Sequence, residues 1–188
     1  MNENPKTQET PDKQQKERME ALDWLYCLAS AIVIVILLCS FFIRPIVVYG
    51  SSMVPTLEDR NLVLINLQSG RYDRGDIVVV RKDSFMQTPI IKRVIATEGQ
   101  TVDIDFAEGV VYVDGKALDE PYINDLTHEP EDFTEPVTVP EGSVFVMGDN
   151  RNRSTDSRSA RLGCVDTRFI LGKAFLRLTP LNRFGGMK

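Results

Sequence analysis

The feature that most constrains this chain is a run of twenty residues, 24–43, without a charged side chain. As an α-helix, twenty residues span about 30 Å, the thickness of the hydrocarbon core of a bilayer. Trp24 and Tyr26 at the start of the run suit the membrane interface, and the charged Arg44 follows its end. The run therefore predicts a transmembrane helix over residues 23–44.

A soluble core helix and a cleaved signal peptide both fit this run less well. A buried core helix of a soluble protein normally keeps a polar face, and this run has none. A cleaved signal peptide has a shorter apolar core and small residues at its cleavage site, whereas the flank here is Ile43-Arg44-Pro45. The sequence therefore favours a span that stays in the membrane.

Residues 1–22 precede the span and are rich in Gln, Glu and Lys, with few large apolar side chains. Such a segment cannot bury enough surface to offset its chain entropy, so we expect a disordered tail. The nearest cations are more numerous before the span than after it: Lys6, Lys13, Lys16 and Arg18 against Arg44 and Arg60. The positive-inside rule predicts a cytoplasmic tail, with residues 45–188 on the outer face of the plasma membrane.

After the span the sequence changes to short apolar runs separated by glycines and other turn residues, a pattern typical of β-strands. The runs cover residues 46–48, 62–65, 76–80, 90–95, 110–113 and 144–147. Asp114-Gly115 after the fifth run is a hairpin signal. Closely spaced strands without helices between them predict a mainly β domain over residues 45–188, built as an antiparallel sheet or barrel.

Composition argues against some classes of function. The chain has 22 Lys and Arg against 27 Asp and Glu, a net charge of −5, whereas proteins that bind nucleic acid usually carry a basic face. The only histidine, His128, lies in the acidic segment 117–135 and is expected to be an ordinary loop residue. The three cysteines lack metal-site spacing, and Cys164 is expected to be a small, buried apolar residue. The sequence thus indicates no metal, no organic cofactor and no nucleic-acid partner.

Ser52 lies in a glycine- and proline-flanked segment, residues 50–55 (GSSMVP), at the end of an extended run. A serine on such a turn exposes its hydroxyl, with its backbone N–H directed into the same cleft. That geometry suits attack on a carbonyl and stabilisation of the resulting oxyanion. Ser52 is therefore a candidate nucleophile.

Lys92 lies in a predicted strand, where it shares one face with Ile90 and Val94. An ammonium between apolar side chains loses its hydration, which lowers the lysine pKa. A neutral amine can take the proton of a serine hydroxyl, so Lys92 is a candidate general base. For this segment taken alone, the alternative is a surface lysine beside Arg93 whose stem lies along the protein.

A polar loop, residues 147–158, follows the last predicted strand. Four of its charged side chains are expected to form a paired network that fixes the loop: Asp149, Arg151, Asp156 and Arg158. Ser154 is expected to hydrogen-bond a catalytic group. A solvated surface loop is the alternative, although Gly-Asp-Asn-Arg directly after an apolar strand is unusual for plain surface.

Taken in order, these motifs resemble the type I signal peptidases over nearly everything from Ile46 to about Pro180. The matching segments are residues 50–57, 75–80, 91–93, 148–151, 154–158 and 172–174. Each motif alone is modest evidence for this family, but the ordered set of motifs after a membrane span is highly specific for it.

The resemblance implies a Ser/Lys catalytic dyad with Ser52 as nucleophile and Lys92 as base, and it makes Ser154 the serine that orients the lysine. The four charged residues named above match the network behind the site. Four apolar residues match positions that line small substrate pockets: Val48, Met53, Leu57 and Ile91.

The same resemblance implies a largely β catalytic domain whose apolar surface sits against the outer face of the membrane. Family members remove signal peptides from exported precursors and cut after small residues at positions −3 and −1. The implied partners are membrane lipid, precursor proteins with signal peptides, and the export machinery.

The chain departs from the family pattern at four places. Gly50 stands where some members have a serine hydroxyl in the oxyanion hole, so Gly50→Ser is expected to add a donor or change nothing. Asn152-Arg153 replaces the usual Asp-Asn pair in the polar loop. The turns at Arg60-Asn61 and at residues 96–100 also differ.

Two further functions compete with that of a signal peptidase. A self-cleaving repressor of the SOS response shares a Ser-Met nucleophile and a lysine base, but it carries a DNA-binding helix-turn-helix where this chain has a tail and a membrane span. A membrane-anchored β domain that only binds partners requires Ser52 and Lys92 to be coincidental. Cleavage of a precursor with Ala-x-Ala before its mature part separates the enzyme from the binding domain.

Overall fold

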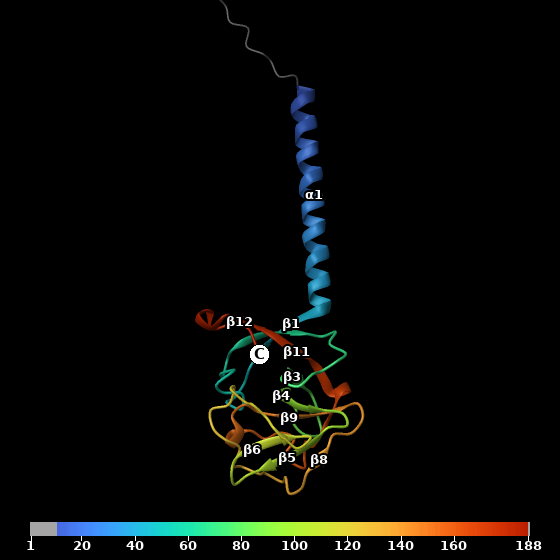
Figure 1. Cartoon of the computed structure of the whole chain (residues 1–188). Helices are drawn as coiled ribbons and strands as arrows, with labels where there is room; N and C mark the ends of the chain where they lie inside the picture. The colour runs from blue at the N-terminus through green and yellow to red at the C-terminus, as the bar shows by residue number, and fades with distance from the viewer. Residues whose placement is uncertain (1–10, 188) are drawn as a thin grey trace, which may run out of the picture. The chain divides into compact units, whose positions relative to one another are not determined.

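The computed structural model describes residues 11–187, which form an N-terminal helix and a β domain that divide between Phe41 and Phe42. The helix, α1, runs over Pro11–Phe42 (Figure 1). Its segment Arg18–Phe42 is long and apolar enough to cross a membrane, and an 18-residue window within it has a mean hydropathy of 2.7. The apolar run of the sequence is thus confirmed as a helix.

The helix begins earlier than the sequence suggests. Residues 11–22, expected in the disordered tail, belong to α1, and residues 1–10 lie outside the described residues. Gln, Lys, Glu, Met and Ala favour helix, and proline suits the first helical position. An established helix extends into such residues without a new nucleation cost. Disorder was expected from composition and from the few side chains that could be buried, without regard to the helix propensity of residues 11–22.

The helix ends at Phe42, and the chain passes at once into strand β1, Ile43–Val47. The span expected to reach residue 44 therefore ends two residues earlier. Ile43 lies opposite Asn66 in the neighbouring strand, so pairing within a sheet replaces helix at this point. Pro45 is tolerated there because β1 is an edge strand.

The β domain holds an eight-stranded antiparallel sheet in the order β1-β2-β11-β3-β4-β9-β10, with β12 paired to β11. The other strands are β2 Leu62–Asn66, β3 Ile77–Val80, β4 Ile90–Thr97, β9 Ser143–Met147, β10 Val165–Asp166, β11 Ile170–Arg177 and β12 Gly185–Gly186. Lys92 of β4 lies opposite Val78 of β3, and Arg93 lies opposite Met147 of β9. This register places the predicted base beside the polar loop that follows β9.

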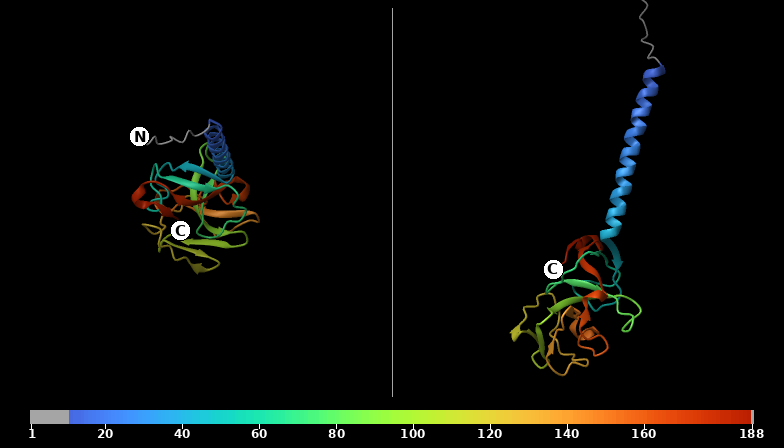
Figure 2. Two further views of the ribbon diagram at one scale, coloured as in Figure 1. Left: turned by 90° about the horizontal axis from the view of Figure 1, so that it is seen from above. Right: turned by 90° about the vertical axis from the view of Figure 1, so that its right-hand side faces the viewer.

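A second antiparallel sheet has the order β7-β6-β5-β8. Its strands are β5 Thr101–Asp105, β6 Val110–Val113, β7 Lys116–Ala117 and β8 Val137–Thr138. Within the β domain it lies at the end away from β1 and β12 (Figures 1 and 2). Short 3-10 helices occur at η1 Arg151–Arg153, η2 Thr167–Phe169 and η3 Leu181–Arg183. The prediction of a mainly β, antiparallel domain is confirmed.

Strand β3 shows how the apolar cores are arranged. Ile77 and Val79 belong to one buried cluster, whereas Val78 and Val80 belong to another. Successive side chains of a strand point to opposite faces, so a strand buried on both faces is apolar at every position. A third cluster contains residues from both sheets, including Ile95, Val102, Val111 and Phe145.

Most predicted strands occur where the sequence placed them, within a few residues. The strands that were not predicted are the two-residue strands β7, β8, β10 and β12 and the longer strands β5 and β11. On β5 the buried Val102 and Ile104 alternate with the exposed Asp103 and Asp105, so the alternation was present but the apolar run was too short to recognise. On β11 a lysine and a glycine interrupt the apolar pattern.

Candidate active site

Ser52 lies in the turn that follows β1, and its side chain is partly exposed. Its main chain is held from the polar loop, because the N–H of Asn150 donates to the Ser52 carbonyl over 3.0 Å. The Asn150 side chain donates to the carbonyl of Ser51 over 3.0 Å. Within residues 11–187 the Ser52 N–H has no hydrogen-bond acceptor, so it remains available to a ligand.

Gly50 shapes the start of this turn. Its φ of 90° lies in the left-handed region, and its N–H donates to the Asp59 carboxylate over 2.8 Å. A Cβ at Gly50 would meet no atom within 4 Å, so space is not the constraint. The constraint is the backbone conformation, which L side chains rarely adopt. This conformation argues against the expected benefit or neutrality of Gly50→Ser, because the added side chain would strain the turn that carries Ser52.

Lys92 reaches the turn from β4, where its Nζ donates a hydrogen bond to Ser52 Oγ over 2.8 Å. Lys92 is only 3% exposed. By strand alternation and register it shares its face of the sheet with Ile90, Val94 and Val78. The two partners come from segments 40 residues apart in the chain, and the sheet brings them together.

Burial lowers the pKa of Lys92 from its ordinary value of 10.5 to about 8, because the ammonium loses hydration. The carboxylates of Asp156 and Glu131 favour the charged form and oppose part of this shift. A substantial fraction of Lys92 is therefore neutral under mildly alkaline conditions, with its lone pair beside a serine hydroxyl.

Gly148, at the start of the polar loop, permits this close assembly. A Cβ there would lie 2.2 Å from Ser154 Oγ and 2.5 Å from the Ser52 carbonyl oxygen. Contacts this short require the backbone or the serine to move. Extending the β4–β9 register by one residue places Gly148 opposite Lys92. Glycine is therefore required here by the approach of both serines.

Asp156 organises the polar loop from inside. Its Oδ2 accepts hydrogen bonds from Ser154 Oγ over 2.8 Å and from the Gly148 N–H over 2.9 Å. Its Oδ1 accepts from Arg158 Nε over 2.9 Å, and both side chains of this ion pair are fully buried. Arg158 also donates to the carbonyls of Glu129 and Ser154. Asp156 and Arg158 thus pair as expected from the sequence.

Ser154 differs from its expected contact. Its hydroxyl donates to Asp156, and within the described residues the hydrogen bond of Lys92 Nζ goes to Ser52 and not to Ser154. Ser154 nevertheless lies beside the site, since its side chain fills the space next to Gly148. Its expected role as the residue that orients Lys92 stays a prediction.

Asp149 does not pair with Arg151, its neighbour in the loop. It binds Arg93 of β4 through two hydrogen bonds, Nε to Oδ1 over 2.8 Å and Nη2 to Oδ2 over 2.7 Å. Both side chains are buried, and Asp149 also accepts from the hydroxyl of Thr56. The expected four-residue network is corrected here, because the β4–β9 register, which brings Arg93 beside the start of the loop, supplies the partner of Asp149.

Arg151 likewise finds its partner outside the loop. Its guanidinium binds Glu120 through two hydrogen bonds of 2.8 and 2.7 Å and donates to the carbonyl of Gly148 over 3.0 Å. Tyr122 donates to Glu120 over 2.8 Å, and burial raises the pKa of its hydroxyl, which therefore stays protonated. The ring of Tyr122 lies 4.0 Å from the guanidinium carbon of Arg93. The sequence did not single out Glu120 or Tyr122, because both lie in the acidic segment that looked like solvated loop.

The four predicted pocket residues lie in a single apolar cluster. Val48, Met53, Leu57 and Ile91 are 3%, 1%, 0% and 8% exposed, and they pack together with residues of β2, β3 and β11. Three of them flank Ser52 in sequence, and Ile91 precedes Lys92. The dyad therefore stands at the border of an apolar wall, which suits a ligand with small apolar side chains.

The departure at Asn152 has a clear structural consequence. Its Oδ1 accepts from the N–H groups of His128 and Glu129 over 3.0 and 3.1 Å, and its Nδ2 donates to the Leu126 carbonyl over 3.0 Å. An amide supplies both the acceptor and the donor that these bonds require, whereas a carboxylate lacks the donor. Asn152 therefore ties the polar loop to the acidic segment, and Arg153 is exposed.

His128 and Cys164 lie apart from this chemistry. His128 is exposed in a loop, where its Nδ1 lies 2.9 Å from the Phe106 carbonyl. Cys164 is a free, half-buried thiol packed against an apolar cluster, and burial raises its pKa. Among residues 11–187 no group of His, Cys, Asp and Glu side chains is arranged to hold a metal ion.

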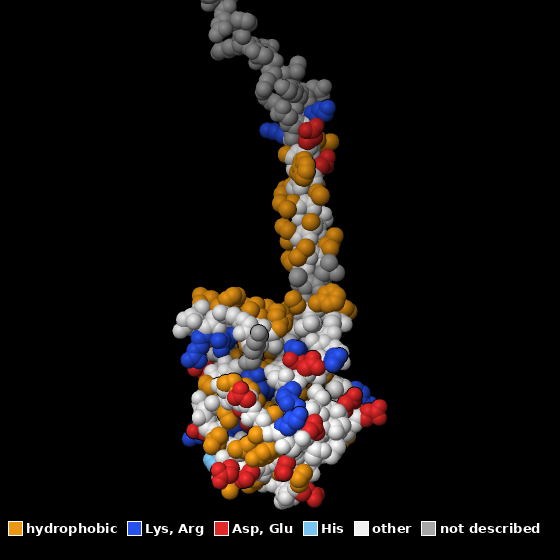
Figure 3. Space-filling model, in the orientation of Figure 1, with side chains coloured by type: hydrophobic (Ala, Val, Ile, Leu, Met, Phe, Trp, Pro, Cys, Tyr) orange, Lys and Arg blue, Asp and Glu red, His pale blue; other side chains and the backbone are white. Residues whose placement is uncertain are grey.

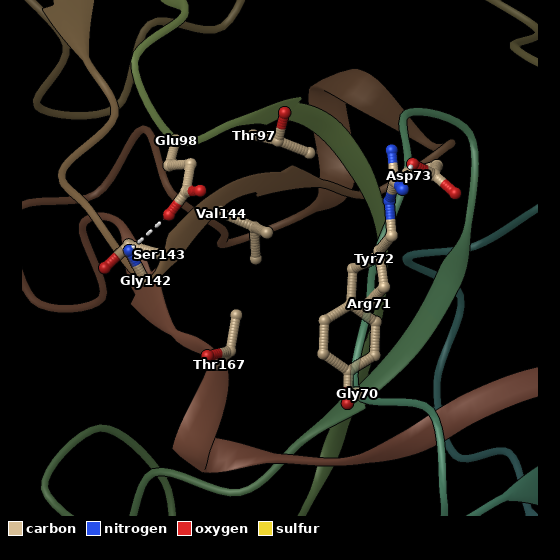
Figure 4. A pocket seen from close by; sticks show the side chains of 10 residues that line it. All are labelled: Gly70, Arg71, Tyr72, Asp73, Thr97, Glu98, Gly142, Ser143, Val144 and Thr167. Atoms are coloured by element: carbon tan, nitrogen blue, oxygen red, sulfur yellow. Dashed lines mark hydrogen bonds and ion pairs between the residues drawn. The ribbon is translucent and has the colours of Figure 1, made fainter.

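A separate hollow of about 400 Å³ lies between the loop at residues 70–73 and the ends of β4 and β9 (Figure 4). Tyr72, Arg71, Thr167 and Glu98 are among its lining residues, and Glu98 accepts a hydrogen bond from the Gly142 N–H over 2.8 Å. Neither Ser52 nor Lys92 lines it. The hollow is therefore not the site of the serine and lysine.

The chain is similar to known proteins of one family. The model of a protein family described as signal peptidase, peptidase S26, matches residues 21–179. Signal peptidase I S of Bacillus subtilis (strain 168) is 36% identical over 178 residues, which cover 88% of this chain and 93% of that protein. Signal peptidase I of Bacillus licheniformis is 34% identical over 184 residues, covering 92% of this chain and 96% of that protein.

A further relative and a solved structure are also named as signal peptidases. Signal peptidase IB of Staphylococcus aureus (strain Mu50 / ATCC 700699) is 32% identical over 185 residues, covering 89% of this chain and 94% of that protein. A crystal structure of a signal peptidase I from Enterococcus faecalis V583 aligns with a TM-score of 0.43 and 30% identity, covering 55% of this chain and 96% of that chain. The family match contains the turn of Ser52, strand β4 and the polar loop. This chain therefore belongs to the signal peptidase family, peptidase S26, a family of serine endopeptidases.

Proposed function

We propose that this protein is a type I signal peptidase, which removes N-terminal signal peptides from exported precursor proteins by means of a Ser52–Lys92 dyad. The observation that carries the proposal is the 2.8 Å hydrogen bond between the buried Lys92 Nζ and Ser52 Oγ. Family membership supports the reaction, and the names of the relatives, signal peptidase I, support the class of substrate.

In the first half of the reaction, Ser52 Oγ attacks the carbonyl carbon of the residue at position −1. Its proton passes to the neutral amine of Lys92, which can accept it because burial lowers the lysine pKa to about 8. The tetrahedral intermediate then collapses to an ester on Ser52. The departing amine of position +1 takes the proton from Lys92, which becomes neutral again.

In the second half, water attacks the ester and Lys92 takes a proton from it. Collapse of this second intermediate releases the new carboxyl end of the signal peptide, and the proton returns to Ser52 Oγ. The negative oxygen of both intermediates needs a donor. The N–H of Ser52, which has no acceptor among residues 11–187, can serve as one. Gly50 adds no side-chain donor to it.

The apolar wall formed by Val48, Met53, Leu57 and Ile91 would take the small side chains at positions −1 and −3. Such a wall is closely packed, so a larger side chain has no space without moving it. Asp149, Arg151, Asp156 and Arg158 hold the loop behind the dyad through their buried ion pairs, and Ser154 supports Asp156.

The proposed location is the plasma membrane, with one span, a cytoplasmic N-terminus and the β domain, residues 45–188, on the outer face. Exposed apolar side chains gather at the end of the β domain that carries β1 and β12 (Figure 3): Val47, Tyr49, Phe175, Leu181 and Phe184. A patch of this kind suits contact with membrane lipid. Precursors with signal peptides and the export machinery are the other proposed partners.

The test is incubation of the detergent-solubilised full-length chain with a precursor that carries Ala-x-Ala before its mature part. Cleavage after the last alanine by the wild type, and none by Ser52→Ala, is expected. A wild type that binds the precursor without cutting it would make the protein a binding domain. Protease treatment of intact cells checks the orientation: accessible residues 1–22 with a protected β domain would reverse it.

A further inference from the structure

Arg177, the last residue of β11, joins two parts of the chain that the proposed mechanism does not connect. Its Nη1 donates to the Thr56 carbonyl over 2.6 Å, and its Nε donates to the Arg183 carbonyl over 2.7 Å. Thr56 belongs to the turn that carries Ser52, and Arg183 belongs to the C-terminal segment, residues 179–187. One half-buried guanidinium thus ties the C-terminal segment to the main chain of that turn.

The C-terminal segment is itself well anchored. The N–H of Leu62 donates to Thr179 Oγ1 over 2.8 Å, Arg183 pairs with Glu58 over 2.7 Å, and β12 pairs with β11. Met187 packs against the apolar cluster that contains the four proposed pocket residues. The family match ends at residue 179, where this segment begins.

Thr56 is the junction between the two supports of the turn. Its hydroxyl donates to Asp149 and accepts from Arg93, while its carbonyl accepts from Arg177. Residue 56 lies between Met53 and Leu57, two of the proposed pocket residues. A displacement of its main chain would therefore move the pocket wall.

Ser52 is held by other contacts. Asn150 binds the carbonyls of Ser51 and Ser52, and Lys92 binds the Ser52 hydroxyl. Loss of the Arg177 contact would leave these bonds in place. The pocket wall and the dyad are thus supported separately, which allows one to change without the other.

We infer that Arg177 is a positioning residue through which the C-terminal segment sets the width of the pockets for the small side chains at −1 and −3. The inference rests on the proposed signal peptidase function and adds to it a determinant of specificity. A guanidinium suits the role because its planar fork can donate to two carbonyls in a fixed geometry, whereas an ammonium has no such fork.

The experiment compares two full-length precursors that differ only at position −1, alanine or valine, with detergent-solubilised wild type and Arg177→Ala. Charge-assisted hydrogen bonds of this kind affect an equilibrium by roughly tenfold. We expect the KM for the alanine precursor to rise about tenfold and the preference for alanine over valine to fall about tenfold. The kcat should stay within about threefold, and the acid limb of the pH profile should not move.

Arg177→Lys should recover part of the preference, and Arg168→Ala, at an exposed arginine outside the site, should match the wild type. An unchanged KM and preference in Arg177→Ala would overturn the inference, as would a loss confined to kcat. If Arg177→Ala does not fold by circular dichroism, Arg177→Lys decides: a preference for alanine below that of the wild type supports the inference, and an unchanged preference overturns it. Failure of the proposed function itself would show differently, as a wild type without cleavage or an active Ser52→Ala.

Discussion

The two faces of strand β4 place adjacent cations in different surroundings. Lys92 and Arg93 are both almost fully buried, at 3% and 1% exposure. Arg93 faces a carboxylate, Asp149, which binds it through two hydrogen bonds and compensates its charge. Lys92 faces a hydroxyl, Ser52, and no ion pair is formed at its Nζ within the described residues.

The difference teaches how one strand can provide both support and reactivity. A buried ion pair costs desolvation but, once formed, holds its two segments in one geometry. A buried amine without a carboxylate partner is driven toward its neutral form. Alternation along β4 places Arg93 on the face toward Asp149 and Lys92 on the face toward Ser52. The two adjacent cations therefore have different hydrogen-bond partners.

The most severe way to break this comparison is to give the Lys92 face a permanent cation. Lys92→Arg keeps the charge, but a guanidinium does not lose its proton in proteins and cannot serve as a base. We expect kcat/KM for precursor cleavage to fall by at least about 10³-fold, with a similar loss in Lys92→Ala and no further loss when Ser52→Ala is added. Substantial activity in the arginine variant would make Lys92 a structural cation.

The next prediction breaks the other face. Asp149→Asn leaves the Arg93 guanidinium buried without a compensating charge, and losing one partner of a buried pair costs about 3–5 kcal/mol of stability. The melting temperature of the solubilised protein should drop clearly. Asp166→Asn, which removes the partly exposed carboxylate that pairs with the exposed Arg168, is the matched control and should leave the melting temperature nearly unchanged. Equal effects of the two variants would mean that burial does not distinguish these pairs.

A third prediction sharpens the comparison through pH. The acid limb of kcat/KM should report a pKa of about 8, with roughly tenfold loss for each pH unit below it. Glu131→Gln removes a carboxylate that favours the charged lysine, so the limb should move to lower pH. An acid limb that reports a pKa near 10.5 would show that Lys92 is not desolvated in solution.

The same pKa shift has a consequence for stability. Between pH 8 and 10.5 the unfolded chain binds more protons at Lys92 than the folded chain, so the free energy of unfolding contributed by this residue rises with pH in that window. Below pH 8 the lysine is charged in both the folded and the unfolded chain, and the penalty for burying the ammonium is complete. Lys92→Met should therefore raise the melting temperature at pH 7 while abolishing cleavage. A lower melting temperature would mean that packing of the lysine stem outweighs its desolvation.

The smallest effect is expected at the only histidine. His128 is exposed in a loop and hydrogen-bonds a main-chain carbonyl, so His128→Ala should leave kcat/KM within about threefold. If β4 supplies the base, no other titrating group is needed. A thousandfold loss of kcat/KM in a folded His128→Ala protein would mean that Lys92 is not the base.

Local patterns in the sequence identified a large part of the molecule. The uncharged run gave helix α1, and period-two apolar runs gave the strands that carry the site. The sequence also named Ser52 and Lys92, and in the structure their atoms lie within hydrogen-bonding distance. These features depend on a few neighbouring residues, whose spacing alone decides which face of a strand a side chain takes.

Local patterns do not predict which side chains from distant segments meet. The sequence suggested a paired network within the polar loop, but Asp149 pairs with Arg93 of β4, and Arg151 pairs with Glu120 of the acidic segment. The requirement for glycine at 148 and the contact of Arg177 with Thr56 also arise between distant segments. Local patterns are enough to predict the elements and the reactive residue types. Their partners depend on long-range pairing and close packing, since the free energy of a buried charge is fixed by whatever the fold places beside it.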